Sequence, residues 1–532
     1  MSASLESLFP TADGIDPAWR YVPDQSGLSL IIDGKLLTWD GPRSSIASAI
    51  VTRSVDGETS PVDLGPAALA SAEIGRAAVE AASRAWKGGR GDWPRASVAE
   101  RIRAVEAFVG RAKTRRERVA RVLMWEVGKP YKDCLVEFDR TMRYIEDTIA
   151  TLRDLDRSSA AAVHDSGFAA RIRRAPLGVC LCMGPFNYAV NEVYTLILPS
   201  LIMGNPVITK TPRYGVLANA LFTEALAASF PPGVINFVTG DGATVIGPMM
   251  ESGLVDVLAL IGSAKTARLL MRQHPQPNRL RSVLGLGAKN IAIVLADADL
   301  DQAVTEIVSG ALTFNGQRCT AIKLVLAARP IAEALVERLA DRVAAVPVGM
   351  PWQDGVVVTP MPDRGHTDYL ESLVRDTQAR GGRVVNQGGA ERAATLLSPA
   401  VLYPVTPEME IFSVEQFGPL IPVGVFDDVE QALAVIEGSP VGQQAAIFGK
   451  DPKVIGPLVD HLANLVCRVN LNTQCRRGPD SFPFTGRKDS AVGTLSLSDA
   501  LRVFSIRSVV ASADAGAGLL HEIEGTSRFL AV

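Results

Sequence analysis

The chain has 532 residues, too many for one hydrophobic core, so two or three domains are expected. Hydrophobic residues make up 47% of it and charged residues 21%, as in ordinary soluble globular proteins. The net charge of −3 gives no electrostatic reason to expect nucleic acid or a membrane as a partner. The six cysteines lack the spacing of metal ligands, so we predict no metal site and a reduced, cytoplasmic setting.

The first part of the chain predicts a hairpin followed by helices. Residues 1–15 lack the basic start and apolar segment of a signal peptide. Residues 28–39 alternate around Asp33-Gly34, a pattern typical of a β-hairpin. From 71 to 155 the pattern is helical, and we interpret the arginine-rich run 111–118 as the polar face of an amphipathic helix.

The middle of the chain alternates between predicted strands and helices. Residues 158–176 begin with small and polar residues and then alternate between apolar and polar ones, a pattern that predicts a protruding hairpin. The most apolar region, 177–207, is interrupted by glycine, proline and polar residues, which favours a buried strand, loop and helix over a membrane span. Strands and helices continue to alternate, and a single helix is predicted at 216–228. Such alternation is typical of a mostly parallel, doubly wound sheet.

A second α/β block begins near residue 290. Its first strand is predicted at 291–295, and Asp299 is expected to cap the helix that follows. The block runs to about residue 494. After residue 495 the chain alternates as an added strand would, and it then becomes rich in glycine and alanine.

The segment Phe314-Asn-Gly-Gln-Arg-Cys-Thr-Ala321 places one cysteine between a basic and a hydroxyl residue. A lone cysteine is most often an inert core residue, but a nucleophilic thiolate needs an electropositive, partly open pocket, which Arg318 beside a glycine turn could supply. The octapeptide resembles the active-site cysteine segment of the aldehyde dehydrogenase superfamily. The resemblance implies that Cys319 is the nucleophile and that Arg318 and Thr320 contact the substrate.

Gly184-Pro-Phe-Asn-Tyr188 is similar to the Pro-Phe-Asn motif of the same superfamily. The side-chain amide of Asn187 can donate a hydrogen bond to an oxyanion, whereas an isolated asparagine at such a place is more often a turn residue or helix cap. Tyr188 is typical of the non-phosphorylating glyceraldehyde-3-phosphate dehydrogenase branch. In that branch Arg477 is the position that binds the substrate phosphate, and it would form a phosphate-binding cluster with Arg140, Tyr188 and Arg318.

The resemblance also implies a dinucleotide site. Lys210 ends a predicted central strand, where the family places it on the adenosine ribose. NAD-preferring members usually carry glutamate where Arg213 stands. Arg213 is either a surface residue or the partner of a 2′-phosphate, so the resemblance points to NADP, with NAD as the alternative.

Three further segments match the family's cofactor motifs. The glycines Gly240 and Gly242 are spaced too loosely for the Rossmann fingerprint but match the family's own pattern. Gly262 and Ser263 match the next motif, where a helix N-terminus would meet the pyrophosphate. Glu415-Gln-Phe417-Gly-Pro matches the segment whose glutamate holds the nicotinamide ribose, although glycine and proline would also suit an exposed turn.

One motif departs from the family pattern. Gly285 stands where most members carry the glutamate that activates water, and glycine cannot accept a proton. Three interpretations remain open: another group such as Glu192 relays the proton, coenzyme A accepts the acyl group as in the acylating semialdehyde branch, or deacylation is slow or absent. A scaffold that keeps this fold without catalysis is the contrasting class.

The resemblance implies a doubly wound Rossmann-type cofactor domain, an α/β catalytic domain and a small β oligomerisation element. The expected activity is oxidation of a small aldehyde such as glyceraldehyde 3-phosphate to the acid through a Cys319 thioester, in a homodimer or homotetramer. The predicted domain ranges are 1–157 with 177–289 for the cofactor domain, 290–494 for the catalytic domain, and 158–176 with 495–532 for the oligomerisation element and tail.

Overall fold

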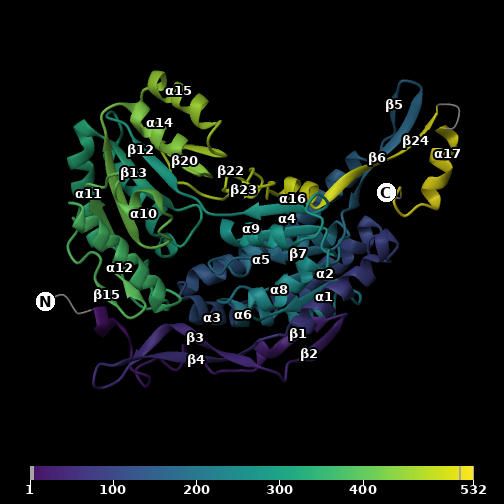
Figure 1. Cartoon of the computed structure of the whole chain (residues 1–532), viewed down its shortest axis with the longest axis horizontal. Helices are drawn as coiled ribbons and strands as arrows, with labels where there is room; N and C mark the ends of the chain where they lie inside the picture. Colours follow the sequence, from purple (N-terminus) through teal and green to yellow (C-terminus); the bar gives the residue numbers. More distant parts are fainter. Residues whose placement is uncertain (1–4, 514–516, 531–532) are drawn as a thin grey trace.

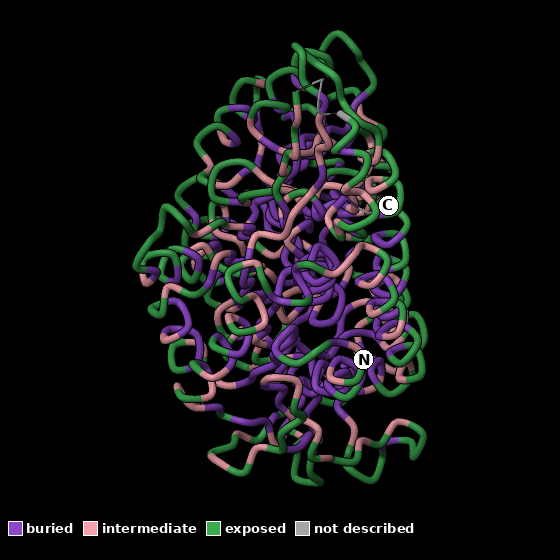
Figure 2. Tube along the Cα trace, turned by 90° about the vertical axis from the view of Figure 1, so that its right-hand side faces the viewer, coloured by how far each residue is buried: buried purple, intermediate pink, exposed green. Residues whose placement is uncertain are grey.

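The computed structural model describes residues 5–513 and 517–530, so the outermost residues of the first and last predicted ranges lie outside the description. It contains two large, mostly parallel sheets, each with helices on both faces, and the predicted α/β fold is confirmed (Figure 1). Within these ranges, no helix is both long enough and apolar enough to cross a lipid bilayer. Figure 2 shows the buried backbone gathered in the interior, with exposed segments around it.

The first sheet has eight strands in the order β2-β1-β9-β8-β7-β10-β11-β23. The five strands from β9 to β11 are parallel, and β1, β2 and β23 add antiparallel edges. The chain order reverses at β7, because β8 and β9 lie on one side of it and β10 and β11 on the other. The strands are β1 (Ser29–Ile32), β2 (Lys35–Thr38), β7 (Cys180–Met183), β8 (Val207–Lys210), β9 (Ile235–Val238), β10 (Val257–Ile261), β11 (Arg281–Gly285) and β23 (Ala491–Val492).

Helices cover both faces of this sheet because successive strand residues point in opposite directions. Cys180 and Cys182 pack into the layer formed by α2 to α7, whereas Leu181 and Met183 pack against α1, α8 and α9. The helices are α1 (Ala72–Trp86), α2 (Val98–Lys113), α3 (Arg116–Val127), α4 (Tyr131–Ser158), α5 (Asn191–Ile202), α6 (Val216–Ala220), α7 (Thr223–Ala227), α8 (Gly242–Glu251) and α9 (Ala264–Gln273).

Two predicted helical features are wrong in detail. The single helix predicted at 216–228 is broken between α6 and α7, because the Thr223 hydroxyl donates to the Ala220 carbonyl at 2.7 Å and Phe222 turns into the aromatic core against Tyr194. The arginine run 111–118 is not one helix face, since it spans the junction between α2 and α3. Its arginines pair there with acidic residues, Arg115 with Glu224, Arg116 with Asp139 and Arg118 with Asp24.

The second sheet has the strand order β14-β17-β18-β13-β12-β20-β21 and is parallel except for β14. Asp299 caps α10 as predicted, accepting from the backbone N–H groups of Asp301 and Gln302. The strands are β12 (Asn290–Val294), β13 (Ile322–Ala328), β14 (Arg383–Val384), β17 (Ala400–Tyr403), β18 (Leu420–Phe426), β20 (Gln444–Phe448) and β21 (Arg468–Leu471). The helices are α10 (Leu300–Leu312), α11 (Ala332–Ala344), α12 (Arg364–Ala379), α13 (Glu410–Ser413), α14 (Val429–Gly438) and α15 (Pro452–Leu462).

The predicted hairpin and the predicted added strand meet in a third, three-stranded sheet. β6 (Phe168–Pro176) pairs with β5 (Val163–Asp165) on one side and with β24 (Ser505–Ala513) along its whole length on the other. Figure 1 shows this sheet projecting from the body of the molecule with α17 (Ala517–Glu522) beside it. The remaining elements are β3 (Arg43–Arg53), β4 (Thr59–Ala68), β15 (Arg392–Ala393), β16 (Leu396–Leu397), β19 (Val441–Gly442), β22 (Arg487–Lys488), α16 (Leu497–Val503) and short 3₁₀ turns.

A buried carboxylate links two helices of the first domain. Glu126 in α3 is fully buried and accepts hydrogen bonds from the backbone N–H groups of Leu217 and Ala218 at the start of α6. Burial raises the pKa of this carboxyl from 4.5 to about 7. The folded chain therefore keeps a proton that the unfolded chain releases between these two values, so stability falls as the pH rises through this window.

We expect Glu126→Gln to remove part of this pH dependence. The unfolding temperature of the wild type should fall from about pH 5 to about pH 7, and the variant should show a flatter profile because its amide does not titrate. Thermal melts followed by circular dichroism over this range measure the difference. Glu80→Gln, at an exposed position of α1, should melt like the wild type. Identical slopes for Glu126→Gln and the wild type would contradict the assignment.

Candidate active site

A cavity of about 940 Å³ lies where the parallel strands of the first sheet end. Segments that follow β7, β8, β10 and β11 line one part of it, and segments of the second α/β block line the rest. Doubly wound sheets bind ligands at this edge, where the strand order reverses. The predicted site residues that line the cavity are Arg140, Asn187, Tyr188, Lys210, Gly242, Gly262, Ser263, Arg318, Cys319, Thr320, Glu415, Phe417 and Arg477.

Two predicted site residues do not line this cavity. Arg213 is exposed, and its guanidinium lies 5.2 Å from the centre of the Tyr214 ring, just beyond the cavity segment that ends at Pro212. Gly240 has a φ of +118°, and a Cβ there would come within 2.9 Å of the Ala70 nitrogen. The geometry therefore gives Gly240 a role in the turn that leads from β9 to α8.

A tight turn before β13 positions Cys319. Phe314 and Asn315 have φ values of +50° and +56°, which side chains rarely adopt, and a Cβ on Gly316 would meet the Gly418 oxygen at 2.5 Å. Asn315 is fixed by two hydrogen bonds of 2.9 Å to the backbone of Thr359. The left-handed conformation is stabilised by these contacts, as is common where a functional side chain must be presented.

The Cys319 thiol lies in a pocket that disfavours its charged form. Burial raises the pKa of this thiol, the charges of Glu192 and Glu415 raise it further, and Lys323 lowers it. The expectation that Arg318 supplies the electropositive environment is wrong, because its guanidinium turns away and donates to the Gly310 carbonyl at 2.8 Å. The positive charge that lowers the pKa of the thiol comes from Lys323 instead.

Sequence reasoning missed Lys323. Its ammonium group donates to the carbonyls of Arg318 and Cys319, both at 2.8 Å, and lies 2.9 Å from the Glu415 carboxylate. Its position could have drawn attention, because it lies four residues after the cysteine in an apolar run. A lysine is buried in such a strand only when it is paired with polar or charged groups.

Asn187 is brought close to the cysteine segment. Its side-chain amide is buried and donates to the Gln317 carbonyl at 2.8 Å, two residues before Cys319. An amide N–H at this place can serve an oxyanion that forms on the cysteine adduct.

A buried ion pair that the sequence did not indicate holds the Asn187 loop. Lys129 pairs with Glu137, donates to the Asn187 carbonyl at 2.7 Å and lies 4.0 Å from the centre of the Tyr188 ring. Glu137 in turn accepts from the backbone N–H of Val190 at 2.9 Å, at the entrance to α5. Tyr188 thus packs against a lysine, and it lines the same cavity as Arg140, Arg318 and Arg477.

The other part of the cavity fits a dinucleotide. The N-termini of α8 and α9 open onto it, with Asp241 and Ser263 as their caps. A Cβ on Gly242 would meet no atom within 4 Å, so the approach to the first helix is open. Helix N-termini favour phosphate groups, and Lys210 and Glu415 line the same cavity.

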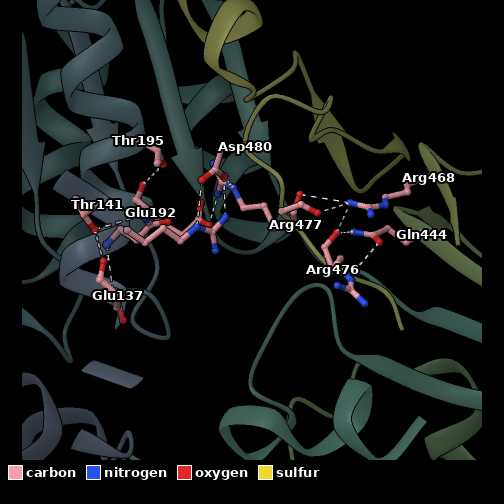
Figure 3. A network of polar contacts seen from close by, with 12 residues as sticks. Glu137, Thr141, Glu192, Thr195, Gln444, Arg468, Arg476, Arg477 and Asp480 are labelled. Atoms are coloured by element: carbon pink, nitrogen blue, oxygen red, sulfur yellow. Dashed lines mark hydrogen bonds and ion pairs between the residues drawn. The ribbon is translucent and has the colours of Figure 1, made fainter. Parts of the chain in front are cut away.

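The arginines predicted to bind phosphate are matched by carboxylates. Arg140 donates to both oxygens of Asp480, at 2.7 and 3.2 Å. Arg477 pairs with Glu192 and lies 3.6 Å from Asp480 (Figure 3). Arg477 still has two buried nitrogens, Nε and Nη2, without hydrogen-bond partners among the described residues.

Gly285 ends β11 and lines the cavity without offering a functional group. A Cβ at this position would lie 3.3 Å from the Ile261 side chain. Among the described residues, the acidic side chains that line the cavity are Glu192, Asp241, Glu415 and Asp489.

We expect Lys323→Met to slow alkylation of Cys319. Removal of the one basic charge that lowers the pKa of this thiol should make iodoacetamide labelling at neutral pH about three- to tenfold slower, because less thiolate is present. Mass spectrometry of the Cys319 peptide gives the rate, and Lys132→Met, at an exposed position, is the control. An unchanged rate in Lys323→Met would mean that this lysine does not act on the thiol.

Comparison with known proteins agrees with this site. The model of the aldehyde dehydrogenase family matches residues 59–510. An NADP-dependent glyceraldehyde-3-phosphate dehydrogenase of Streptococcus equinus is 33% identical over 422 residues, which cover 78% of this chain and 86% of that protein. Malonate-semialdehyde dehydrogenase 2 of Shouchella clausii is 28% identical over 441 residues, or 81% of this chain and 88% of that protein.

A solved structure gives the same result for the fold. The crystal structure of NADP-dependent glyceraldehyde-3-phosphate dehydrogenase from Bacillus halodurans, complexed with NADP, matches with a TM-score of 0.83 and 32% identity. The match covers 91% of this chain and 99% of that one. The chain belongs to the aldehyde dehydrogenase family, as the motifs around Asn187, Cys319 and Glu415 predict.

Proposed function

We propose that this protein oxidises a small aldehyde to the carboxylic acid with NADP as the electron acceptor, through a thioester on Cys319. The observation that carries the proposal is the shared cavity, onto which Cys319, the Asn187 loop and the N-termini of α8 and α9 all open. NADP is favoured over NAD because the Streptococcus and Bacillus relatives are named as NADP-dependent and the Bacillus protein was crystallised with NADP.

The chain's own residues account for the first half of the reaction. The Cys319 thiolate attacks the aldehyde carbon, and the Asn187 amide and the Cys319 backbone N–H stabilise the resulting oxyanion. Lys210, Ser263 and Glu415 would hold the cofactor, which supplies the hydride acceptor for thioester formation. Hydrolysis of the thioester then releases the acid.

Glyceraldehyde 3-phosphate is the substrate we propose first. It is named in the Streptococcus and Bacillus relatives, and the buried Nη2 of Arg477 has no hydrogen-bond partner among the described residues. A phosphate there would share Arg477 with Glu192 and Asp480, so its affinity depends on how far these carboxylates already neutralise the arginine.

Transfer of the acyl group to coenzyme A is the second candidate function. It is favoured by one specific observation, the glycine at position 285 followed by Gly287-Ala-Lys-Asn290, which resembles the acylating semialdehyde branch. The malonate-semialdehyde relative is consistent with it. The remaining possibility is a protein in which the reaction stops at the thioester on Cys319.

The first test follows NADPH through the first turnover and beyond, with glyceraldehyde 3-phosphate and with or without coenzyme A. Steady turnover in water supports the hydrolytic dehydrogenase. A stoichiometric burst that continues only with coenzyme A supports the acylating enzyme, and a burst that stalls in both conditions indicates an arrested thioester. The absence of any burst would exclude glyceraldehyde 3-phosphate as the substrate of this protein.

We expect Cys319→Ser to abolish NADPH formation, by at least about a thousandfold, because serine is a far weaker nucleophile than a thiolate. Equilibrium titration of NADP by fluorescence should give an unchanged dissociation constant, since the cofactor contacts are elsewhere in the cavity. Retained turnover in this variant would exclude Cys319 as the nucleophile.

We expect Arg213→Glu to raise the KM for NADP about tenfold and to leave the KM for NAD nearly unchanged. A carboxylate would repel the 2′-phosphate that a guanidinium attracts, whereas NAD lacks this group. Steady-state kinetics with the two cofactors measure the ratio, with NAD as the internal control. Equal effects on both cofactors would mean that Arg213 does not meet the 2′-phosphate.

A further inference from the structure

Gly285 offers no base for hydrolysis of the thioester, but the cavity that it lines contains other carboxylates. We propose that Glu192 accepts the proton of the water that hydrolyses the Cys319 thioester. The inference rests on the proposed function, because it concerns the second half of the same reaction. It assigns the deacylation step to a residue of helix α5 instead of the end of strand β11.

The position of Glu192 suits this role. It lies in the first turn of α5, five residues after Asn187, so the loop that presents the amide also leads to the carboxylate. Its side chain is only 9% exposed and lines the same cavity as Cys319. After burial, the charge of Glu192 is the largest cause that raises the pKa of the Cys319 thiol, as expected for two neighbouring groups.

One oxygen of Glu192 is held and the other is available. Arg477 donates to Oε1, whereas Oε2 is buried without a hydrogen-bond partner among the described residues. An unpaired buried carboxylate oxygen is costly, and a water molecule that donates to it would relieve that cost. The Arg477 guanidinium fixes the orientation of the carboxylate through Oε1 and leaves Oε2 available to a water molecule.

The other acidic residues of the cavity are less suited. Glu415 pairs with the buried Lys323 at 2.9 Å, and Asp241 accepts from the Thr244 backbone N–H as the cap of α8. Asp489 is half exposed and 3.4 Å from Arg268. Among the described cavity acids, Glu192 is the one that is buried and whose second oxygen has neither a hydrogen bond nor an ion pair, since the buried Oε1 of Glu415 faces Lys323.

The proposed step balances without a further reactant. The water oxygen bonds to the thioester carbonyl carbon while one of its protons passes to Oε2 of Glu192. The tetrahedral oxyanion, stabilised by the Asn187 amide, then collapses, and the bond between carbon and sulfur breaks. The products are the carboxylic acid, which keeps the second water proton, and the Cys319 thiolate, while Glu192 returns its proton to solvent through the cavity.

The test compares Glu192→Gln with Asp480→Asn, which removes the other carboxylate beside Arg477 but does not line the cavity. We expect Glu192→Gln to keep the stoichiometric NADPH burst and to lose steady turnover by about 10²- to 10⁴-fold, because only deacylation needs the base. Asp480→Asn should keep the ratio of steady rate to burst rate. Hydroxylamine, a stronger nucleophile than water, should restore turnover of Glu192→Gln.

A cofactor-free assay separates this inference from the proposed function. With 4-nitrophenyl acetate, acylation of Cys319 gives a burst of nitrophenolate and deacylation sets the following rate, whatever aldehyde the protein uses. We expect Glu192→Gln to show the burst and lose the following rate, and Glu192→Asp, which keeps a carboxylate, to recover part of it. Cys319 of Glu192→Gln should also react faster with iodoacetamide, since a neighbouring negative charge is gone.

Three results would overturn the inference. The first is a following rate in Glu192→Gln equal to that of the wild type. The second is an equal loss in Asp480→Asn, which would mean that only the arginine network matters. The third is a loss of the burst itself in both Glu192→Gln and Glu192→Asp, because Glu192 would then act before the thioester forms.

Discussion

The geometry of the catalytic cavity depends on the buried ion pair between Lys129 and Glu137. This pair connects α4 to the loop that follows β7, since Lys129 holds the Asn187 carbonyl and Glu137 holds the backbone N–H groups at the start of α5. Removing one partner of such a pair typically costs about 3–5 kcal/mol, because the other charge stays buried. The backbone that carries Asn187 and Glu192 is therefore positioned in part by Lys129 and Glu137, which do not line the cavity.

Charge balance is the second constraint on this site. Arg140 and Arg477 enter the cavity region with Asp480 and Glu192, so two guanidinium groups face two carboxylates. Burial of this kind requires pairing, because an isolated charge in the interior is much less stable. An anionic group on the substrate would add to a network that is already close to neutral, and it would bind through the remaining N–H groups of Arg477.

Much of this arrangement could be predicted from sequence because its signals are local. The order of predicted strands and helices indicated parallel sheets, which the structure contains. Short motifs pointed to Asn187, Cys319 and Glu415, which line one cavity. The roles of Lys129 and Asp480 could not be found in this way, because Lys129 holds Asn187, 58 residues away, and Asp480 holds Arg140, 340 residues away. The direction of Arg318 also depends on the α10 carbonyls, which no local pattern reveals.

If Glu192 is the base, the glycine at position 285 moves control of hydrolysis from the end of strand β11 to helix α5. A base on β11 would lie on the sheet that also carries the cofactor segments, whereas Glu192 lies on α5 and is bonded to Arg477. If Glu192 is the base, the guanidinium that orients it is also the donor that an anionic substrate group would use. Binding of that group and hydrolysis of the thioester would then be coupled through the Arg477 side chain.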